Sequence, residues 1–250
     1  PEVMVSTISA VSGHGEISYG NAIGSVICNA ALIAAITVAV RPGKVDPKTL
    51  RVPVAFFFAA AAIYCVAAYG MGRFTRPMGL LMLGMFVAYM AANVWQMKNA
   101  PAEPEHEEEP MGIGKIVLLL VVGAALIALG ANLLVDNGTI IAQAMGVPES
   151  VIALTFVALG TSLPELVTAI TSLMKGHSDL SLGNVVGANV FNLVLVSGMS
   201  VTLAPFEIPQ SATLFGINSS LVLELPVMLL VMVLLTIPAL VRGKLSRVQG

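Results

Sequence analysis

Long apolar stretches, each close to the length of a membrane-spanning helix, alternate with short polar segments along almost the whole chain. Six of these stretches contain no Asp, Glu, Lys, Arg or His, and a seventh contains a single acid, Glu165. About 18 or more consecutive apolar residues indicate a helix that crosses a bilayer, whose apolar layer is about 30 Å thick. The sequence therefore predicts seven spans, at residues 17–40, 52–72, 77–97, 116–135, 150–174, 180–206 and 225–241.

The composition agrees with an all-α integral membrane protein and excludes several soluble classes. Hydrophobic residues make up 57% of the chain and charged residues 10%, whereas a soluble domain has about 25% charged residues. The sequence contains no nucleic-acid-binding, Walker-type or haem motif, so we expect the lipid bilayer and no nucleic acid among its partners. Cys28 and Cys65 lie inside apolar stretches without metal-ligand spacing, and we expect them to be packing residues rather than a disulfide.

The chain contains an internal repeat, and each copy opens with a Pro-Glu pair, at Pro1-Glu2 and Pro164-Glu165. Residues 1–33 align without gaps to residues 164–196, with eleven identical positions. Shared Glu, His, Asn and Gly at fixed spacing rarely arise by chance, even in so apolar a chain. We expect a first repeat at residues 1–97, a linker at residues 98–114, and a second half at residues 115–250 that contains the second repeat. Because the copies match only in part, we also expect further helices beyond both ends of this chain.

The two copies should have opposite orientations in the membrane, because an odd number of spans separates the two Pro-Glu pairs. When the loops alternate between sides, ten of the twelve Lys and Arg residues fall on one side, and Arg73 and Arg76 fall on the other. The positive-inside rule predicts that the basic side, with the acidic linker, is cytoplasmic. We expect the linker to be a solvated spacer. Inverted repeats are typical of secondary transporters, whose substrate sites lie near the midplane on broken helices.

Two acids lie where a charge is costly. Glu165 lies within the apolar stretch 150–174, and Glu2 is its counterpart in the first copy. A charged side chain at the bilayer centre costs at least about 2.5 kcal/mol, so an acid there indicates a functional site with a partner. A structural hydrogen-bonded pair of acids is the alternative interpretation.

Oxygen atoms surround the second acid in the sequence. Pro164 should kink its helix near Gly160, one turn earlier, and free carbonyl groups around Ala158–Thr161. Thr161 and Ser162 add hydroxyl groups. A set of oxygen ligands without nitrogen or sulfur favours Ca²⁺, Na⁺ or Mg²⁺ over Zn²⁺ or Cu⁺.

Facing segments supply further oxygen atoms. Ser25 and Asn29 are one helical turn apart and share a face, and their counterparts in the second copy are Ala188 and Asn192. Gly24, with the glycine four residues before it, permits close approach of another helix.

Other polar residues in the apolar stretches receive structural interpretations. Asn21 and Asn184 are as compatible with hydrogen bonds between helices as with ion binding. We expect Asn189 to lie on a different helix face from Asn192. Glu224, near the outer start of its helix, is expected to be interfacial.

The two copies carry paired motifs: Pro1-Glu2 with Gly20-Asn21-x-x-Gly24-Ser25, and Gly160-Thr161-Ser162-x-Pro164-Glu165 with Gly183-Asn184-x-x-Gly187. They resemble the α-repeats of sodium/calcium exchangers in the cation/calcium antiporter superfamily. The resemblance implies ten helices in two inverted halves, of which this chain would run from the middle of helix two to the loop before helix ten. It implies a site for transported Ca²⁺ and Na⁺ or H⁺, with no resident cofactor. The residues that match the family's ligand positions are Glu2, Glu165, Thr161, Ser162, the Ala158 carbonyl, Ser25, Asn29 and Asn192.

Two departures from the family pattern bear on the counter-ion. Many members have Ser where this chain has Ala188, and sodium-driven members commonly have Asp where it has Asn192. The expected function is Ca²⁺/Na⁺ antiport by alternating access, by a monomer in the plasma or inner membrane, with Ca²⁺/H⁺ exchange as the nearest alternative. A cation channel is the alternative from another class, whereas no catalytic set of residues supports an enzyme.

Overall fold

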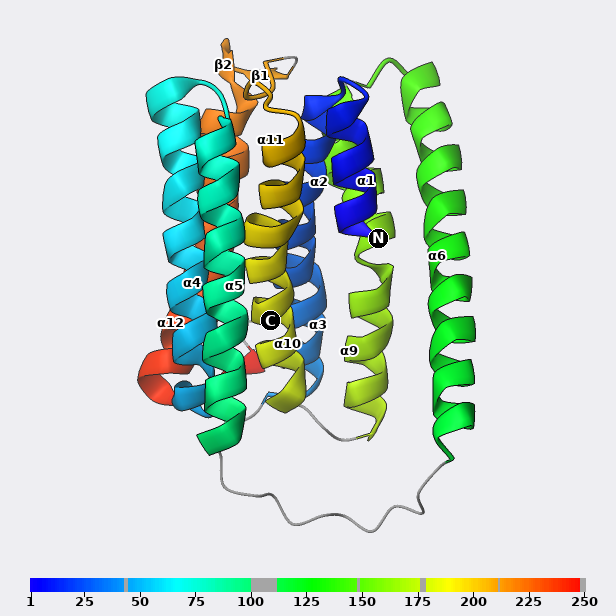
Figure 1. The fold of residues 1–250 in the computed structure, drawn as a ribbon, viewed down its shortest axis with the longest axis vertical. Coiled ribbons are helices and arrows are strands. Elements are labelled where there is room, and N and C mark those ends of the chain that lie inside the picture. The colour runs from blue at the N-terminus through cyan, green and yellow to red at the C-terminus, as the bar shows by residue number, and fades with distance from the viewer. Residues whose placement is uncertain (43–44, 100–111, 148, 176–178, 211, 248–250) are drawn as a thin grey trace.

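The computed structural model describes residues 1–42, 45–99, 112–147, 149–175, 179–210 and 212–247, and most of them are helical. The helices lie side by side along the long axis of the molecule (Figure 1). Within the described residues, five spans are long and apolar enough to cross a membrane, and a bent pair of helices makes a sixth. The predicted all-α membrane fold is thereby confirmed. The five spans are Gly15–Val40, Pro47–Met71, Arg76–Lys98, Leu182–Leu203 and Ser220–Arg242.

The first half of the chain contains a half-length helix followed by three spans. In chain order its elements are α1 (Glu2–Val11), α2 (Gly15–Cys28), the π-helical segment η1 (Asn29–Ala34), α3 (Ala35–Val40), α4 (Pro47–Cys65), the π-helical segment η2 (Val66–Met71) and α5 (Arg76–Asn99).

The second half begins with a long helix and includes the bent pair. Its elements are α6 (Ile113–Ala144), α7 (Glu149–Ile152), η3 (Ala153–Val157), α8 (Ala158–Thr161), α9 (Leu163–Lys175), α10 (Asp179–Phe191), η4 (Asn192–Val196), α11 (Ser197–Leu203), the antiparallel strands β1 (Thr213–Leu214) and β2 (Ile217–Asn218), η5 (Ser220–Glu224) and α12 (Leu225–Arg242). The segments η3, η4 and η5 are π-helical.

The half-helices α1 and α9 run in opposite directions from the middle of the molecule. In Figure 1 the N-terminus lies halfway along the long axis, and α1 leads from it towards the β-hairpin end. Helix α9 also starts near mid-height and runs to the opposite end (Figure 1). This is the arrangement that an inverted repeat requires. It places the first turns of both half-helices, with Glu2 and Glu165, near the middle of the bundle.

Particular residues determine where individual spans begin and end. Helix α4 starts at an Asp46 cap, whose carboxylate accepts a hydrogen bond from the Lys48 N–H at 2.9 Å, with Pro47 in the first helical position. Gly72 and Gly243 end the corresponding spans in the two halves, with φ angles of 67° and 60°. Glycine adopts this left-handed conformation without a Cβ clash, so each glycine allows its span to end there.

Two π-helical segments begin at equivalent positions of the repeat. η1 starts at Asn29 and η4 starts at Asn192, which are counterparts in the sequence alignment. A π-helical turn contains an extra residue relative to the α-helix and is frequent at functional sites, because it disturbs the regular hydrogen-bond ladder. The sequence pattern identifies the two asparagines as candidate site residues, but it does not predict this change of helix type.

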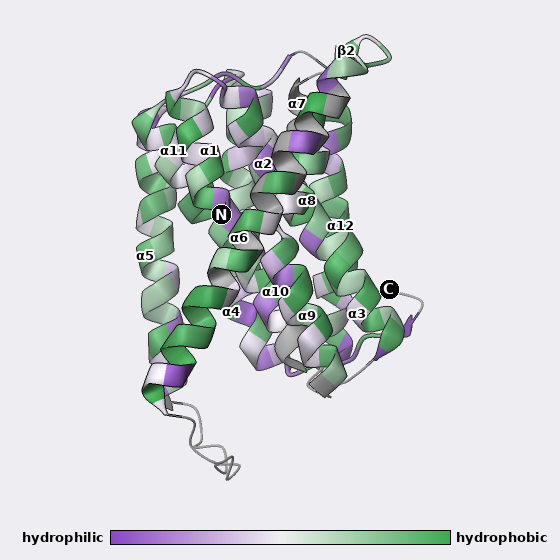
Figure 2. Ribbon diagram, turned by 90° about the vertical axis from the view of Figure 1, so that its right-hand side faces the viewer, coloured by the Kyte–Doolittle hydropathy of each residue, from purple (hydrophilic) through white to green (hydrophobic). Residues whose placement is uncertain are grey.

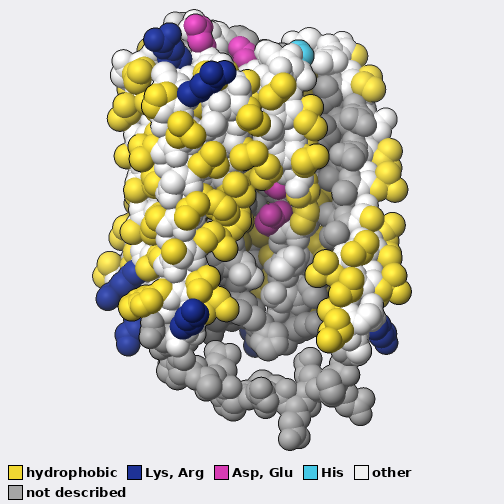
Figure 3. Space-filling model, viewed as in Figure 1, with side chains coloured by type: hydrophobic (Ala, Val, Ile, Leu, Met, Phe, Trp, Pro, Cys, Tyr) yellow, Lys and Arg dark blue, Asp and Glu magenta, His cyan; other side chains and the backbone are white. Residues whose placement is uncertain are grey.

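The surface of the bundle suits a bilayer. Apolar residues cover the lengths of the helices (Figure 2), and α6 exposes large apolar side chains along its whole length, such as Leu120, Leu126 and Leu133. Lys and Arg side chains gather at the two ends, and acidic side chains are visible at the upper end and also at mid-height (Figure 3). Residues 100–111, most of the predicted linker, lie outside the described residues, so the proposed boundaries of the two halves stay a prediction.

Candidate cation site between two half-helices

Glu2 and Glu165 line the same cavity, which has a volume of about 970 Å³. Glu2 is 8% exposed, and Glu165 is partly buried. The two carboxyl groups are close enough to interact electrostatically. Like charges in an apolar setting repel each other, so this pair favours a cation between or beside the two groups.

The predicted kink lies at the second Pro-Glu pair. The axes of Leu154–Thr161 and Leu163–Met174 differ by 53°, and Ser162 is the residue between them. The expectation that the Ala158 carbonyl is freed is wrong in this structure. That oxygen accepts the Ser162 N–H at 3.0 Å and lies 3.2 Å from the Thr161 hydroxyl, because the Ser162 amide completes the helical turn before the bend.

Thr161 connects the two halves of the protein. Its hydroxyl donates to Oδ1 of Asn21 at 2.9 Å and lies 3.3 Å from the Ser25 hydroxyl. The Asn21 amide nitrogen in turn donates to the Ser6 hydroxyl at 2.8 Å. A hydroxyl has one proton, so when Thr161 donates to Asn21, Ser25 is the donor to Thr161. The lone pairs of the Ser25 oxygen then stay available for a cation.

A second bridge between the halves holds Asn29. Its amide nitrogen donates to Oδ1 of Asn189 at 3.0 Å, and the Asn189 nitrogen lies 3.2 Å from the sulfur of Met232. The Asn29 oxygen is buried and has no hydrogen-bond partner among the described residues. Asn189 therefore shares a contact with the candidate site, contrary to the expectation of a separate structural role. Repetition does not single out Asn189, since its counterpart in the first copy is Val26.

Unpaired buried oxygens gather at the predicted ligands. Among the described residues, those without a hydrogen-bond partner include Oγ of Ser162, Oε2 of Glu165 and Oδ1 of Asn29. A buried polar atom without a partner costs about 1–3 kcal/mol. Three of the six buried side-chain oxygens without a partner among the described residues thus belong to predicted ligands.

The segment that begins with α10 in the second copy faces the cavity more than its counterpart α2 does in the first copy. Asn184, Ala188 and Asn192 line the same cavity as the two acids, and Asn184 is exposed there. Asn21, the counterpart of Asn184, is instead fully buried. The expected bridging role thus holds for Asn21, whereas Asn184 faces the cavity.

Two further residues differ from their sequence-based interpretation. The Cys28 thiol lies next to Ser162 and within electrostatic range of Glu165, at the edge of the site rather than only in helix packing. Glu224 lies near the start of its span, where an interfacial residue was expected, but its side chain is buried and accepts hydrogen bonds from two serine hydroxyls.

Fold and site together describe an integral membrane protein in which half-helices bring acids and other oxygen donors to the middle of the bundle, as in inverted-repeat cation transporters. The model of the family described as sodium/calcium exchanger protein matches residues 1–95 and 115–250. The chain belongs to this family of antiporters, so it is a transporter of the exchanger type.

Individual relatives agree with this assignment. The putative antiporter CaxA of Alkalimonas amylolytica is 33% identical over 258 residues, which cover 100% of this chain and 77% of that protein. The inner membrane protein YrbG of Escherichia coli is 33% identical over 85% of this chain and 68% of its own length. The solved structure of the sodium-calcium exchanger NCX_Mj superimposes with a TM-score of 0.75 at 28% identity, over 100% of this chain and 77% of that one.

Proposed function

We propose that this protein exchanges Ca²⁺ for Na⁺ across a membrane by alternating access, with Glu2 and Glu165 as the paired calcium carboxylates. The observation that carries the proposal is the pair of acids on oppositely directed half-helices, which start near the middle of the bundle and whose acids line one cavity. The proposed ligands beside them are Thr161, Ser162, Ser25, Asn29 and Asn192.

The charge of the site suits a divalent ion. Two carboxylates neutralise one Ca²⁺, and hydroxyl and amide oxygens complete the six to eight oxygen ligands that Ca²⁺ usually takes. Na⁺ ions that enter neighbouring oxygen positions compete for the same negative charge. Exchange requires that Ca²⁺ and Na⁺ bind both the inward-open and the outward-open state. An ion shifts the equilibrium between these states only through its different affinities for them.

A second candidate, Ca²⁺/H⁺ exchange, is favoured by two cavity-lining residues. Ala188 provides no hydroxyl and Asn192 no negative charge, whereas sodium-driven relatives commonly have Ser and Asp at these positions. Fewer oxygen donors and less negative charge weaken Na⁺ binding more than proton binding to a carboxylate. In that case, protonation of one of the two acids competes with Ca²⁺ binding in place of Na⁺ binding.

Uptake of ⁴⁵Ca²⁺ into liposomes that contain the full-length protein distinguishes the two. With Na⁺ inside, choline outside and equal pH, calcium uptake above that of empty liposomes is expected for Na⁺ exchange. With no Na⁺ present and an acidic interior, uptake is expected for H⁺ exchange. Absence of uptake under both gradients, in protein that is correctly folded, would contradict the proposed function.

For the setting, we propose the cell membrane, or the inner membrane in a bacterium, as the name of the relative YrbG suggests. The basic end of the bundle would face the cytoplasm. We also propose that the protein functions as a monomer.

A further inference from the structure

A buried acid lies in a span outside the candidate calcium site. Glu224 is the last residue of η5, directly before α12, and is 4% exposed. Ser219 donates to its Oε1 at 2.7 Å, and Ser220 donates to its Oε2 at 3.0 Å. No Lys, Arg or His of the described chain forms an ion pair with it.

An unpaired hydroxyl lies beside this acid. Tyr19 of α2 is 1% exposed, and its hydroxyl makes no hydrogen bond of normal geometry within the described structure. The same hydroxyl lies within interaction range of Ser220 and Glu224. The Tyr19 oxygen is therefore a buried polar atom beside Glu224 that lacks a hydrogen-bond partner among the described residues.

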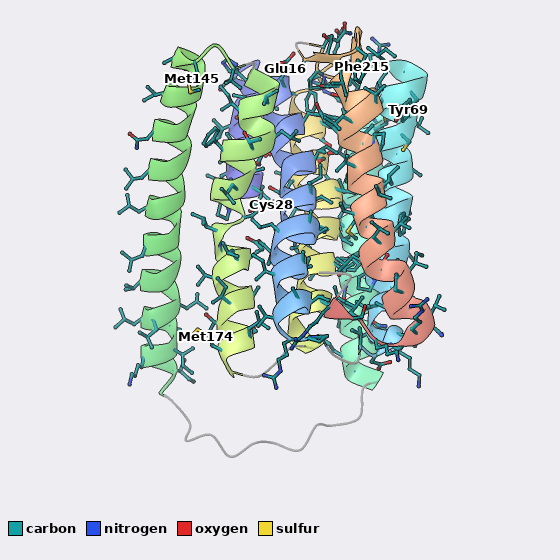
Figure 4. All side chains as sticks on the ribbon, turned by 180° about the vertical axis from the view of Figure 1, so that it is seen from behind. Glu16, Cys28, Tyr69, Met145, Met174 and Phe215 are labelled. Atoms are coloured by element: carbon teal, nitrogen blue, oxygen red, sulfur yellow. The ribbon has the colours of Figure 1, made fainter. Side chains whose placement is uncertain are left out.

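A third element, the span that begins with α4, contacts η5 beside this acid. The Tyr69 hydroxyl, at the end of the span that begins with α4, donates to the Leu221 carbonyl of η5 at 2.6 Å. Figure 4 shows Tyr69 and Phe215 at the same end of the molecule and Met174 at the opposite end. The acid thus lies near the membrane end that carries the β-hairpin, remote from the linker.

The charge at this place has no partner in the described protein. Both carboxylate oxygens of Glu224 accept hydrogen bonds from hydroxyl groups. An ionised acid inside a span is nevertheless costly unless a positive charge accompanies it. The hydroxyl oxygens of Ser219, Ser220 and Tyr19 keep lone pairs that can face a cation.

We propose that Glu224, Ser219, Ser220 and Tyr19 form a second cation site, which holds one monovalent cation. One carboxylate neutralises one positive charge, whereas a divalent ion would stay half compensated. Hard oxygen ligands suit Na⁺, and the same carboxylate also accepts a proton, so the shared chemistry is a single positive charge. This site does not depend on the assignment of Glu2 and Glu165.

The test measures the thermal unfolding midpoint of the purified full-length protein in detergent, in the background of Glu165→Gln. That background reduces the Na⁺ contribution of the candidate calcium site. A ligand that binds the folded state raises the midpoint. If Na⁺ is the occupant, replacing choline by Na⁺ raises the midpoint by about 2 °C or more, and Glu224→Gln abolishes the rise. If a proton is the occupant, the midpoint depends on pH without Na⁺, and Glu224→Gln abolishes that dependence.

Glu207→Gln is the matched control, because Glu207 is an exposed acid at the same end of the molecule. It should retain the responses of the background protein. If Glu224→Gln fails to fold, Tyr19→Phe removes one hydroxyl and keeps the acid, and it should reduce the response by several-fold. Equal Na⁺ and pH responses in the Glu224 or Tyr19 variant and the control would overturn the second site.

Discussion

The Thr161 hydroxyl donates a hydrogen bond to Oδ1 of Asn21 across 140 positions of the sequence, at 2.9 Å. Thr161 ends the half-helix α8 before the kink, and Asn21 lies in the span that faces it. Because Asn21 also holds Ser6 of α1, one amide joins three elements of both halves next to Glu2. The candidate site is therefore built on a hydrogen-bonded frame rather than on isolated side chains.

The bridge between Asn29 and Asn189 should matter for calcium affinity. Asn189→Ala removes the acceptor that holds the Asn29 amide at 3.0 Å, so the Asn29 oxygen loses its fixed direction. Hydrogen bonds between membrane helices contribute about 0.6 kcal/mol on average and up to about 1.7 kcal/mol. We expect the calcium concentration for half-maximal uptake to rise about 3- to 18-fold. An unchanged calcium dependence, with unchanged expression, would show that Asn189 does not position Asn29.

Cys28 should report occupancy of the site. Its thiol is half-buried and lies beside Ser162 and Glu165, so a bound cation and its ordered ligands should hinder access. In a Cys65→Ser variant, we expect Ca²⁺ to slow labelling of Cys28 by a small thiol reagent several-fold. Labelling of Cys65 in the reciprocal Cys28→Ser variant provides the control and should not depend on Ca²⁺. Equal Ca²⁺ effects on both cysteines would place Cys28 outside the site.

Gly24 should tolerate no side chain. A Cβ at this position would lie 2.4 Å from the Leu154 carbonyl oxygen and 2.6 Å from the Ala158 Cβ, so the helices would have to separate. Overpacking of this kind costs about 1–3 kcal/mol. We expect Gly24→Ala to lower the thermal midpoint by several degrees. Gly84→Ala is the control, because a Cβ added there would meet no neighbouring atom within 4 Å; equal stability of the two variants would contradict the close packing.

The fold is largely predictable because membrane spans and internal repeats produce recognisable patterns in a sequence. Runs of apolar residues predict the five spans and the bent pair, and Pro164 predicts the kink at the turn where it occurs. The oxygen-rich motifs also lead to residues whose buried oxygens lack partners, such as Ser162 and Asn29. Whether these residues bind the ion stays a prediction.

Other features depend on tertiary contacts that produce no recognisable sequence pattern. Asn189 and Ser6 have apolar counterparts in the repeat, so repetition does not single them out. The place of Glu224 in its span predicts an interfacial residue, but its burial depends on Ser219 and Ser220 turning towards it within a π-helical segment. The proline predicts a free Ala158 carbonyl, yet the backbone of Ser162 completes the turn before the bend.

Asn192 should influence the choice of counter-ion. Asn192→Asp adds a negative charge to the wall of the cavity that contains both acids, which should strengthen Na⁺ binding. We expect Na⁺-driven calcium uptake to increase relative to pH-driven uptake. Gln143→Glu adds the same charge at an exposed position near the end of α6, which does not line the cavity, and should leave the ratio unchanged. The same ratio in both variants would argue against a role of Asn192 in the site.

The proposed transport depends above all on Glu2 and Glu165 binding the calcium ion together. Glu165→Gln keeps the shape of the side chain and removes one of the two charges, so the site can no longer neutralise Ca²⁺. The decisive measurement is ⁴⁵Ca²⁺ uptake by the full-length Glu165→Gln variant in liposomes, at matched protein content and with a thermal midpoint near that of the wild type. We predict uptake no greater than that of empty liposomes. Uptake at the wild-type rate would contradict the paired-carboxylate site.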